Sequence, residues 1–148
     1  MSYIIRPLNE EDLNQYVLLL RQLTVTGNLS HETKLERYFK IVSNPDHFIF
    51  VLDDTNGKIF GCATLVIEPK FIYDASNLGH IEDVCIDKTY RGKDYGKILM
   101  DYCSQVAESL NCYKLSLTCS AKNIIFYEKC GFHKGETQMV KRFVRSKL

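Results

Sequence analysis

The change in hydrophobic period after residue 45 constrains the fold of this chain more than any other feature. Up to Pro45, apolar residues recur at spacings of three and four, which is typical of amphipathic helices. Residues 48–52 and 58–68 are then apolar runs separated by Asp54-Thr55-Asn56-Gly57, a sequence typical of a hairpin turn. The sequence therefore predicts helices followed by an antiparallel pair of strands.

The rest of the chain continues with alternating strands and helices. We predict strands over residues 3–5, 48–52, 58–68, 79–86, 113–119 and 137–144, and helices over residues 9–24, 30–45, 98–110 and 124–130. Asn9 with Asp12 begins the first helix as a capping-box-like pair, Ser30 caps the second, and Gly131 ends the last. The predicted class is α+β, a mixed sheet with helices on both faces, in one domain over residues 1–148.

Charge and hydropathy exclude several kinds of partner. Nineteen Lys and Arg residues against 18 Asp and Glu residues give a net charge of +1, so no global field attracts nucleic acid or anionic lipid. The longest apolar runs have five residues, whereas a bilayer needs about 20. We therefore expect no nucleic-acid partner and no membrane.

The six cysteines fall singly inside apolar segments. They show neither a CxxC pair nor a Cys/His spacing typical of a metal site, and they are Cys62, Cys85, Cys103, Cys112, Cys119 and Cys130. We expect reduced, mostly buried thiols and no metal, with a disulfide framework as the less favoured alternative.

The two ends of the sequence bear on the cellular location of the protein. Residues 1–8 contain no basic segment leading into an apolar one, so a secretory signal is not expected. Ser146-Lys147-Leu148 is the tripeptide read by the peroxisomal import receptor, and we expect a peroxisome or a glycosome-like organelle. A frayed basic tail on a cytoplasmic protein is the alternative.

The most informative stretch joins a predicted strand to the third helix through residues 87–96, which contain Gly92 and Gly96. A helix start preceded by glycines leaves backbone N–H groups unpaired at the positive end of the macrodipole, which suits phosphate oxygens. Arg91, Lys93 and Lys97 add positive charge. The loop is therefore a candidate anion site, although a turn with solvated lysines would look similar.

Two common phosphate motifs do not fit this loop. Gly92 and Gly96 are separated by three residues rather than the four of a Walker A motif, and Ile98 follows Lys97 where Ser or Thr is required. A GxGxxG dinucleotide motif fails on its spacing as well.

A resemblance narrows the choice. Arg91-x-x-Asp94-x-Gly96 resembles the signature with which the GNAT superfamily of N-acetyltransferases holds the pyrophosphate of acetyl-CoA. Further runs resemble the glucosamine-6-phosphate N-acetyltransferases in order and spacing over nearly the whole chain: Leu23-Thr24, Gly79-His80-Ile81-Glu82-Asp83-Val84, Tyr90-Arg91-Gly92, Asn111-Cys112-Tyr113-Lys114, Asn123-Ile124-Ile125-Phe126-Tyr127-Glu128-Lys129-Cys130-Gly131-Phe132 and Gln138-Met139.

The resemblance implies the GNAT-type acyltransferase fold, with a mostly antiparallel sheet, and acetyl-CoA as co-substrate. In such enzymes the strand ending at residue 86 splays from its neighbour, which frees backbone groups for the pantetheine arm. The residues implied for cofactor binding are Val84, Cys85, Ile86, Arg91, Gly92, Lys93, Asp94, Tyr95, Gly96, Asn123 and Tyr127.

The resemblance also implies the catalytic residues. Tyr127 would stand beside the sulfur of coenzyme A, and a phenol with a pKa of about 10 can donate to a thiolate while staying protonated at neutral pH. Glu82 and Asp83 would contact the sugar and collect the proton of the amine; because they are consecutive, a regular strand would point them to opposite faces. The alternatives are a packing aromatic for Tyr127 and a surface charge with an ion pair for the carboxylates. No covalent nucleophile arrangement is recognisable, which favours direct attack in a ternary complex.

The implied acceptor is an amino-sugar phosphate. Its contacts would come from Thr24, Lys70, Glu82, Asp83, Tyr113, Lys114, Thr118 and Arg142, shared across a homodimer as in this family. Two residues depart from the pattern: Asp94 stands where the signature has Gly, and its carboxylate should point outward. Thr118 stands where related enzymes carry an aspartate.

Three functions remain open. The first is acetyl transfer from acetyl-CoA to glucosamine 6-phosphate, which supplies the synthesis of UDP-N-acetylglucosamine. The second is a GNAT that acetylates protein lysines or N-termini, and the third is a module that binds acyl-CoA without turnover.

Overall fold

Five strands of the computed structural model, which describes residues 1–145, form one sheet in the order β1-β2-β3-β4-β5. The strands are β1 (Ile4–Pro7), β2 (His47–Asp53), β3 (Ile59–Pro69), β4 (Asn77–Ile86) and β5 (Cys112–Leu117). The first four pair antiparallel in chain order, and β4 pairs with β5 in parallel. The mixed, mostly antiparallel sheet is thus confirmed.

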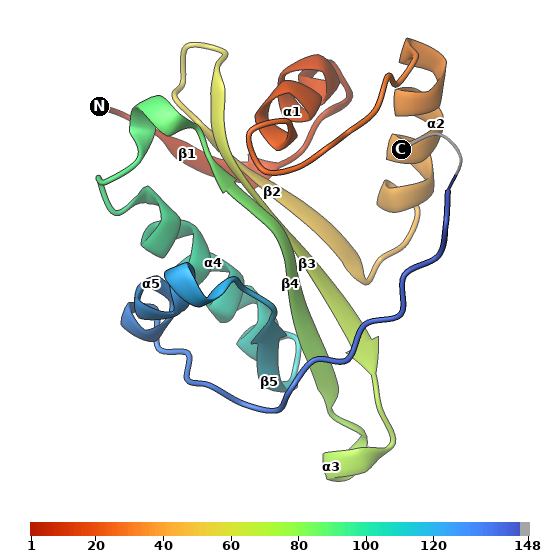
Figure 1. Ribbon diagram of the computed structural model, residues 1–148, viewed down its shortest axis with the longest axis vertical. Coiled ribbons are helices and arrows are strands. Elements are labelled where there is room, and N and C mark those ends of the chain that lie inside the picture. Colours follow the sequence, from red (N-terminus) through yellow and green to blue (C-terminus); the bar gives the residue numbers. More distant parts are fainter. Residues whose placement is uncertain (146–148) are drawn as a thin grey trace.

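Helices cover both faces of the sheet (Figure 1). They are α1 (Leu13–Leu20), α2 (His31–Val42), α3 (Ile72–Ala75), α4 (Tyr95–Ser109) and α5 (Ile124–Lys129), with 3-10 turns η1 (Glu10–Asp12), η2 (Lys88–Tyr90) and η3 (Ala121–Asn123). The predicted cap of α2 is present, since the Ser30 side chain accepts a hydrogen bond from the Thr33 amide at 3.1 Å. Among residues 1–145 there is no helix long and apolar enough to cross a membrane.

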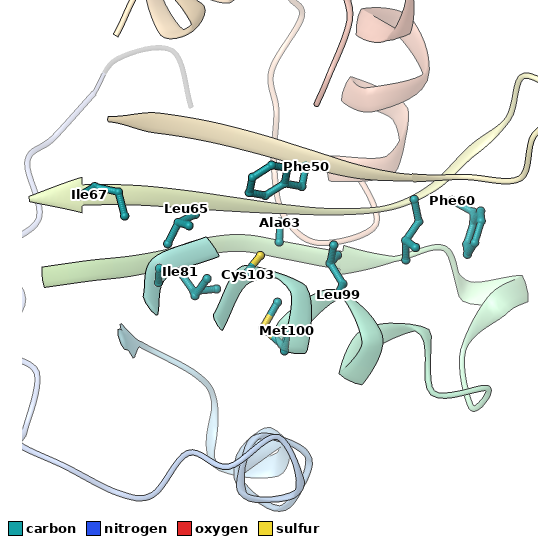
Figure 2. Close-up of a cluster of buried hydrophobic side chains, with 11 residues drawn as sticks. Phe50, Phe60, Ala63, Leu65, Ile67, Ile81, Leu99, Met100 and Cys103 are labelled. Carbon is teal, nitrogen blue, oxygen red and sulfur yellow. The ribbon is translucent and has the colours of Figure 1, made fainter. Parts of the chain in front are cut away.

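Two apolar cores hold the helices to the sheet. On one face, Leu99, Met100 and Cys103 of α4 are fully buried against Leu65 and Ile81 (Figure 2). On the other face α1 packs over β3 and β4, and α2 lies against β2. Burial of each large aliphatic side chain stabilises the fold by about 2 kcal/mol, so the i, i+4 stripe of α4 fixes which way this helix faces.

The predicted last strand is wrong. Residues 137–144 form no strand, and Met139, Phe143 and Val144 are exposed. A strand requires a partner along its edge and cover for its apolar face, and residues 1–145 supply neither to this segment. The sequence pattern is strand-like, but the single chain does not satisfy it.

The other differences are smaller. The first helix ends at Leu20 rather than at residue 24, although turns continue to Thr24, whose amide bonds the Leu20 carbonyl at 3.0 Å. Unforeseen was the short α3 between β3 and β4, in which Tyr73 and Asp74 have positive φ. All six cysteines are free as expected, and Cys62, Cys85 and Cys103 are buried.

Candidate active site

A β-bulge in β4 creates the site. Thr64 of β3 opposes Glu82, and Cys62 opposes Cys85, so the single residue Ala63 faces both Asp83 and Val84. Asp83 has a φ of 50°, a left-handed conformation that a regular strand does not contain.

The bulge reverses which face the side chains of β4 occupy. Ile81 and Ile86 are five residues apart, yet both pack on the α4 side, whereas Cys85 packs on the α1 side. Glu82 and Asp83 are both exposed, so neither carboxylate points into the core, and the opposite faces expected on a regular strand do not apply at the bulge. The extra residue places two adjacent carboxylates at one opening without burying either charge.

Beyond the bulge β4 and β5 separate. Their parallel pairing ends at Ile81 and Leu117, so residues 82–86 have no partner in β5. This separation is the one that the resemblance implied for a splayed strand. A cleft of about 890 Å³ opens there. Its lining contains thirteen of the predicted residues: Glu82, Asp83, Val84, Cys85, Ile86, Arg91, Gly92, Asp94, Tyr95, Gly96, Thr118, Asn123 and Tyr127.

The loop before α4 has the geometry of an anion site. The first helical hydrogen bond runs from the Ile98 amide to the Asp94 carbonyl, so the amides of Tyr95, Gly96 and Lys97 have no partner within the helix. Gly92 has a φ of 76° and Asp94 a φ of 62°, which turns the chain into the helix.

Aromatic packing holds both ends of this loop. Tyr90 stacks on Phe60 with ring centroids 4.4 Å apart, and Tyr95 meets the same ring edge-on at 4.9 Å. Phe60 is fully buried in β3. The loop is therefore tethered to the sheet at its two ends, which presents its backbone amides in one arrangement.

The basic side chains of the loop are less available to bind an anion in the cleft than the sequence suggests. Lys97 pairs with Asp101 at 2.6 Å, which raises the pKa of Lys97, and neither Lys97 nor the predicted Lys93 lines the cleft. Arg91 lines it and donates from Nε to the Ile86 carbonyl at 2.9 Å. Lys122, which the sequence analysis missed, adds a second positive charge to the lining. Its position next to Asn123 is the signal that could have identified it.

Tyr127 lines the cleft and is partly buried on α5. Burial raises the pKa of Tyr127 to about 12, and the nearby Cys119 and Cys130 add to the shift. Its ring packs edge-on against Phe126 and Phe132, with centroids 4.9 and 5.9 Å away. The phenol is therefore held in place and stays protonated over the physiological range.

Cys85 also belongs to the cleft lining, but its thiol donates a hydrogen bond to the Leu19 carbonyl at 3.4 Å on the α1 side of the sheet. Burial raises its pKa, although Arg91 partly opposes this, so a neutral thiol is present at neutral pH. A neutral thiol is a poor nucleophile, which agrees with acyl transfer that does not pass through this cysteine.

The remaining predicted substrate residues do not line the cleft. Thr24 is exposed next to Leu23, which does line it together with Gln22. Lys70 is bound to Glu68 at 2.9 Å, and Glu68 also contacts His80 at 2.7 Å. The others are Tyr113, whose ring packs on Tyr73 with centroids 4.4 Å apart, Lys114, which lies 3.9 Å from Glu136, and Arg142, which is exposed in the extended tail. Within one chain these cations and the cleft are separate.

Comparison with known proteins agrees with this geometry. Residues 14–132 match the acetyltransferase (GNAT) family. The chain belongs to the GNAT family. This GNAT chain is 40% identical to glucosamine 6-phosphate N-acetyltransferase of Arabidopsis thaliana over 145 residues, which covers 96% of this chain and 97% of the relative. It is 42% identical to a probable glucosamine 6-phosphate N-acetyltransferase of Drosophila melanogaster over 130 residues, covering 86% of this chain and 59% of that longer protein.

Solved structures confirm the GNAT fold. The crystal structure of glucosamine-6-phosphate N-acetyltransferase from Arabidopsis thaliana has a TM-score of 0.91 and 39% identity, and covers 97% of this chain and all of its own. An acetyltransferase from Clostridium acetobutylicum, solved with acetyl-CoA, shares the fold with a TM-score of 0.75 at 21% identity, covering 95% of this chain and 96% of its own.

Proposed function

We propose that this chain transfers the acetyl group of acetyl-CoA to the 2-amine of D-glucosamine 6-phosphate. The proposal rests on the cleft between the separating strands β4 and β5. It joins the unpaired edge of β4, the amides at the start of α4 and the phenol of Tyr127. Relatives that are 40% and 42% identical bear the name of this enzyme.

The cleft can bind the thioester in one orientation. The diphosphate lies on the loop at the start of α4, where Arg91 and the residues with unpaired amides, Tyr95 and Gly96, line the cleft. The pantetheine arm follows residues 84–86 of β4 as an added strand would. The acetyl group then lies near the bulge, within reach of Tyr127 on one side and of the carboxylates on the other.

The acceptor amine attacks the acetyl group directly, and side chains of the cleft handle the proton and the leaving sulfur. The amine nitrogen forms a bond with the acetyl carbon, the bond from this carbon to sulfur breaks, and the proton lost by the amine passes to Glu82 or Asp83 or to a water they hold. Tyr127 donates a hydrogen bond to the departing sulfur. The pKa of Tyr127 is about 12, whereas thiols ionise near about 8.5. The phenol therefore stabilises the thiolate through a hydrogen bond and retains its own proton.

A thiol-release assay with acetyl-CoA tests this function. We expect turnover with glucosamine 6-phosphate and little with glucosamine, with a lysine peptide or without acceptor. Turnover with the peptide alone would establish the protein-acetylating GNAT instead, and CoA binding without any turnover would establish the binding module.

We propose further that the acceptor site is completed by a second copy of the chain. Lys70, Lys114 and Arg142 lie outside the cleft of their own chain, while a phosphomonoester requires several cations. The exposed apolar residues Met139 and Phe143 of the tail suit a contact with another subunit. A homodimer with shared sites accounts for both observations.

The proposed location is the peroxisome or a glycosome-like organelle, with the import receptor as partner. Ser146-Lys147-Leu148, on which this proposal rests, lies outside the described residues. The segment that leads to it, residues 137–145, is extended and exposed, which suits recognition by a receptor.

A further inference from the structure

Asp94 occupies an unusual position at the start of α4. It is the N-cap of this 15-residue helix, has a left-handed backbone, and its side chain caps none of the first amides. It is exposed and lines the cleft beside Arg91 and Gly92. A carboxylate therefore stands where unpaired amides and the helix dipole favour an incoming anion.

The ion pairs formed within residues 1–145 do not include Asp94. Lys97 is close enough for Asp94 to contribute to the raised pKa of Lys97, but its ammonium group is bound to Asp101 at 2.6 Å. Asp94 is thus a free negative charge at the diphosphate end of the cleft.

The cleft has few positive charges, so a carboxylate at position 94 affects how strongly an anion binds there. The lining holds two cations, Arg91 and Lys122, and three carboxylates, Glu82, Asp83 and Asp94. Glu82 and Asp83 lie at the bulge, where the acceptor amine is expected. Of these three carboxylates, only Asp94 belongs to the loop that faces the diphosphate, so it opposes the few cations there.

We infer that the negative charge of Asp94 repels the diphosphate and so weakens the binding of every diphosphate-bearing form of coenzyme A. This inference rests on the proposed function, because it concerns the same loop and cleft. Since acetyl-CoA and the product CoA share the diphosphate, Asp94 weakens both equally and shortens the residence time of the product. Asp94 therefore tunes affinity without touching the reacting atoms.

The test is a calorimetric titration of the full chain with coenzyme A. Asp94→Asn removes the charge and keeps a residue that adopts the left-handed conformation at little cost. We expect the Kd to fall about fivefold at low salt, and by less than about twofold at 0.5 M salt, where screening acts over a few ångströms. Asp94→Gly, which also removes the charge, should match Asp94→Asn.

Two controls separate this effect from others. Glu108→Gln removes one negative charge near the other end of α4, about 20 Å away along the helix, and should leave the Kd unchanged. S-acetylpantetheine lacks the diphosphate, so its KM as acetyl donor should be the same for the wild type and for Asp94→Asn.

The outcomes distinguish two failures. If coenzyme A binds the wild type and Asp94→Asn with equal Kd, or binds the variant more weakly, the inference about Asp94 is overturned while the proposed function stands. An equal gain with S-acetylpantetheine would overturn it too, because the effect would then not involve the diphosphate. No heat with coenzyme A in any variant would overturn the proposed function itself.

Discussion

Tyr127 combines a raised pKa with a fixed ring, and both properties follow from its burial on α5. Phe126 and Phe132 hold the ring, while the apolar surroundings disfavour the phenolate. A protonated phenol is the form that donates to a departing thiolate. Its position in the cleft therefore matters as much as its chemistry.

Replacing Tyr127 with Phe should lower kcat about 100- to 1000-fold, the usual contribution of one positioned donor. The Kd for acetyl-CoA should change little, because the ring is retained. Steady-state kinetics and calorimetry separate the two effects. Tyr38→Phe is the matched control, since its hydroxyl bonds the Leu8 carbonyl at 3.4 Å and does not line the cleft.

The raised pKa also predicts a pH profile. An acid whose pKa is raised to about 12 stays protonated throughout the range in which the protein is assayed. We therefore expect no loss of kcat from ionisation of Tyr127 as the pH rises to about 10. A descending limb near pH 9 that disappears in Tyr127→Phe would contradict this assignment.

Arg6 links three parts of the N-terminal half. Its guanidinium bonds Asp12 at 2.6 and 2.9 Å and Asp53 at 2.8 Å, and Asp12 and Asp53 are buried. Burial raises the pKa of Asp12, but the bonds from Arg6 and from the Asn9 amide more than offset this, and the pKa lies below its usual value. The network keeps the carboxylate of Asp12 ionised inside the fold.

Replacing Arg6 with Met should lower the free energy of unfolding by about 3 kcal/mol, because two buried carboxylates lose their partner. A depressed pKa stabilises the fold above the unfolded pKa, near about 4, and this stabilisation is lost as the pH falls through the folded value. The variant should lack that acid-dependent loss. Urea denaturation at pH 7 and pH 3.5 measures both effects, and Arg21→Met, at an exposed site, serves as the control.

At the scale of elements, the start of α4 and the helix α5 meet at Gly96. A Cβ atom on Gly96 would lie 2.9 Å from Cζ of Phe126 and 3.2 Å from its Cε2. The absence of a side chain lets α5 lie against the start of α4, which is the proposed diphosphate site. The anion site and Tyr127 are thus placed relative to each other by one glycine contact.

Gly96→Ala should therefore disturb both functions of the cleft. We expect Phe126 to shift, the Kd for coenzyme A to rise and kcat to fall, each by about three- to tenfold, with about 1–2 kcal/mol of lost stability. Gly135→Ala is the control, since a Cβ there meets nothing within 4 Å. Partial recovery is expected when Gly96→Ala is combined with Phe126→Leu; no recovery would show that the contact is not the cause.

At the scale of the whole molecule, the cleft and the outlying cations belong to different subunits in the proposed dimer. Co-expression of Tyr127→Phe and Arg142→Ala chains tests this arrangement. If Arg142 acts on the partner's substrate, mixed dimers contain one intact site, and the mixture should recover about a quarter of the wild-type activity. Each variant alone should be nearly inactive, and a mixture no better than its parents would place Arg142 in its own subunit's site.

The proposed location is also a property of the whole chain. An N-terminally tagged protein should concentrate in peroxisomes or glycosomes, and deletion of residues 146–148 should leave it in the cytoplasm with unchanged activity. Leu148→Asp tests the same tripeptide without shortening the chain. An unaltered distribution of both variants would remove the targeting role.

Local patterns predicted most of the fold because each element carries its own signals. The stripe of α4, the cap at Ser30 and the turn at residues 54–57 involve residues close in the sequence. The same holds for the loop of Gly92 and Gly96, whose neighbouring residues are sufficient to create an anion site. The residues that meet in the cleft were implied by the family resemblance, and thirteen of them line it.

The placement of Glu82 and Asp83 could not be predicted in this way. The bulge depends on how β4 pairs with β3, and a change of one residue in this pairing exchanges the faces of the strand. Nor could the sequence show that Asp101 binds the ammonium of Lys97, or that residues 137–144 have no strand partner. These outcomes depend on which groups come within contact distance.

By itself, the sequence determined the types and order of nearly all the elements, the glycine-containing loop before α4 and the position of Tyr127 on a short helix, since these follow from propensities and spacings along the chain. Only the tertiary structure decided where β4 and β5 separate, which carboxylates share the opening and which cations remain outside it. The physical reason is that pairing register and charge contacts join residues far apart in the sequence, and their energies depend on distances that exist only in the folded molecule.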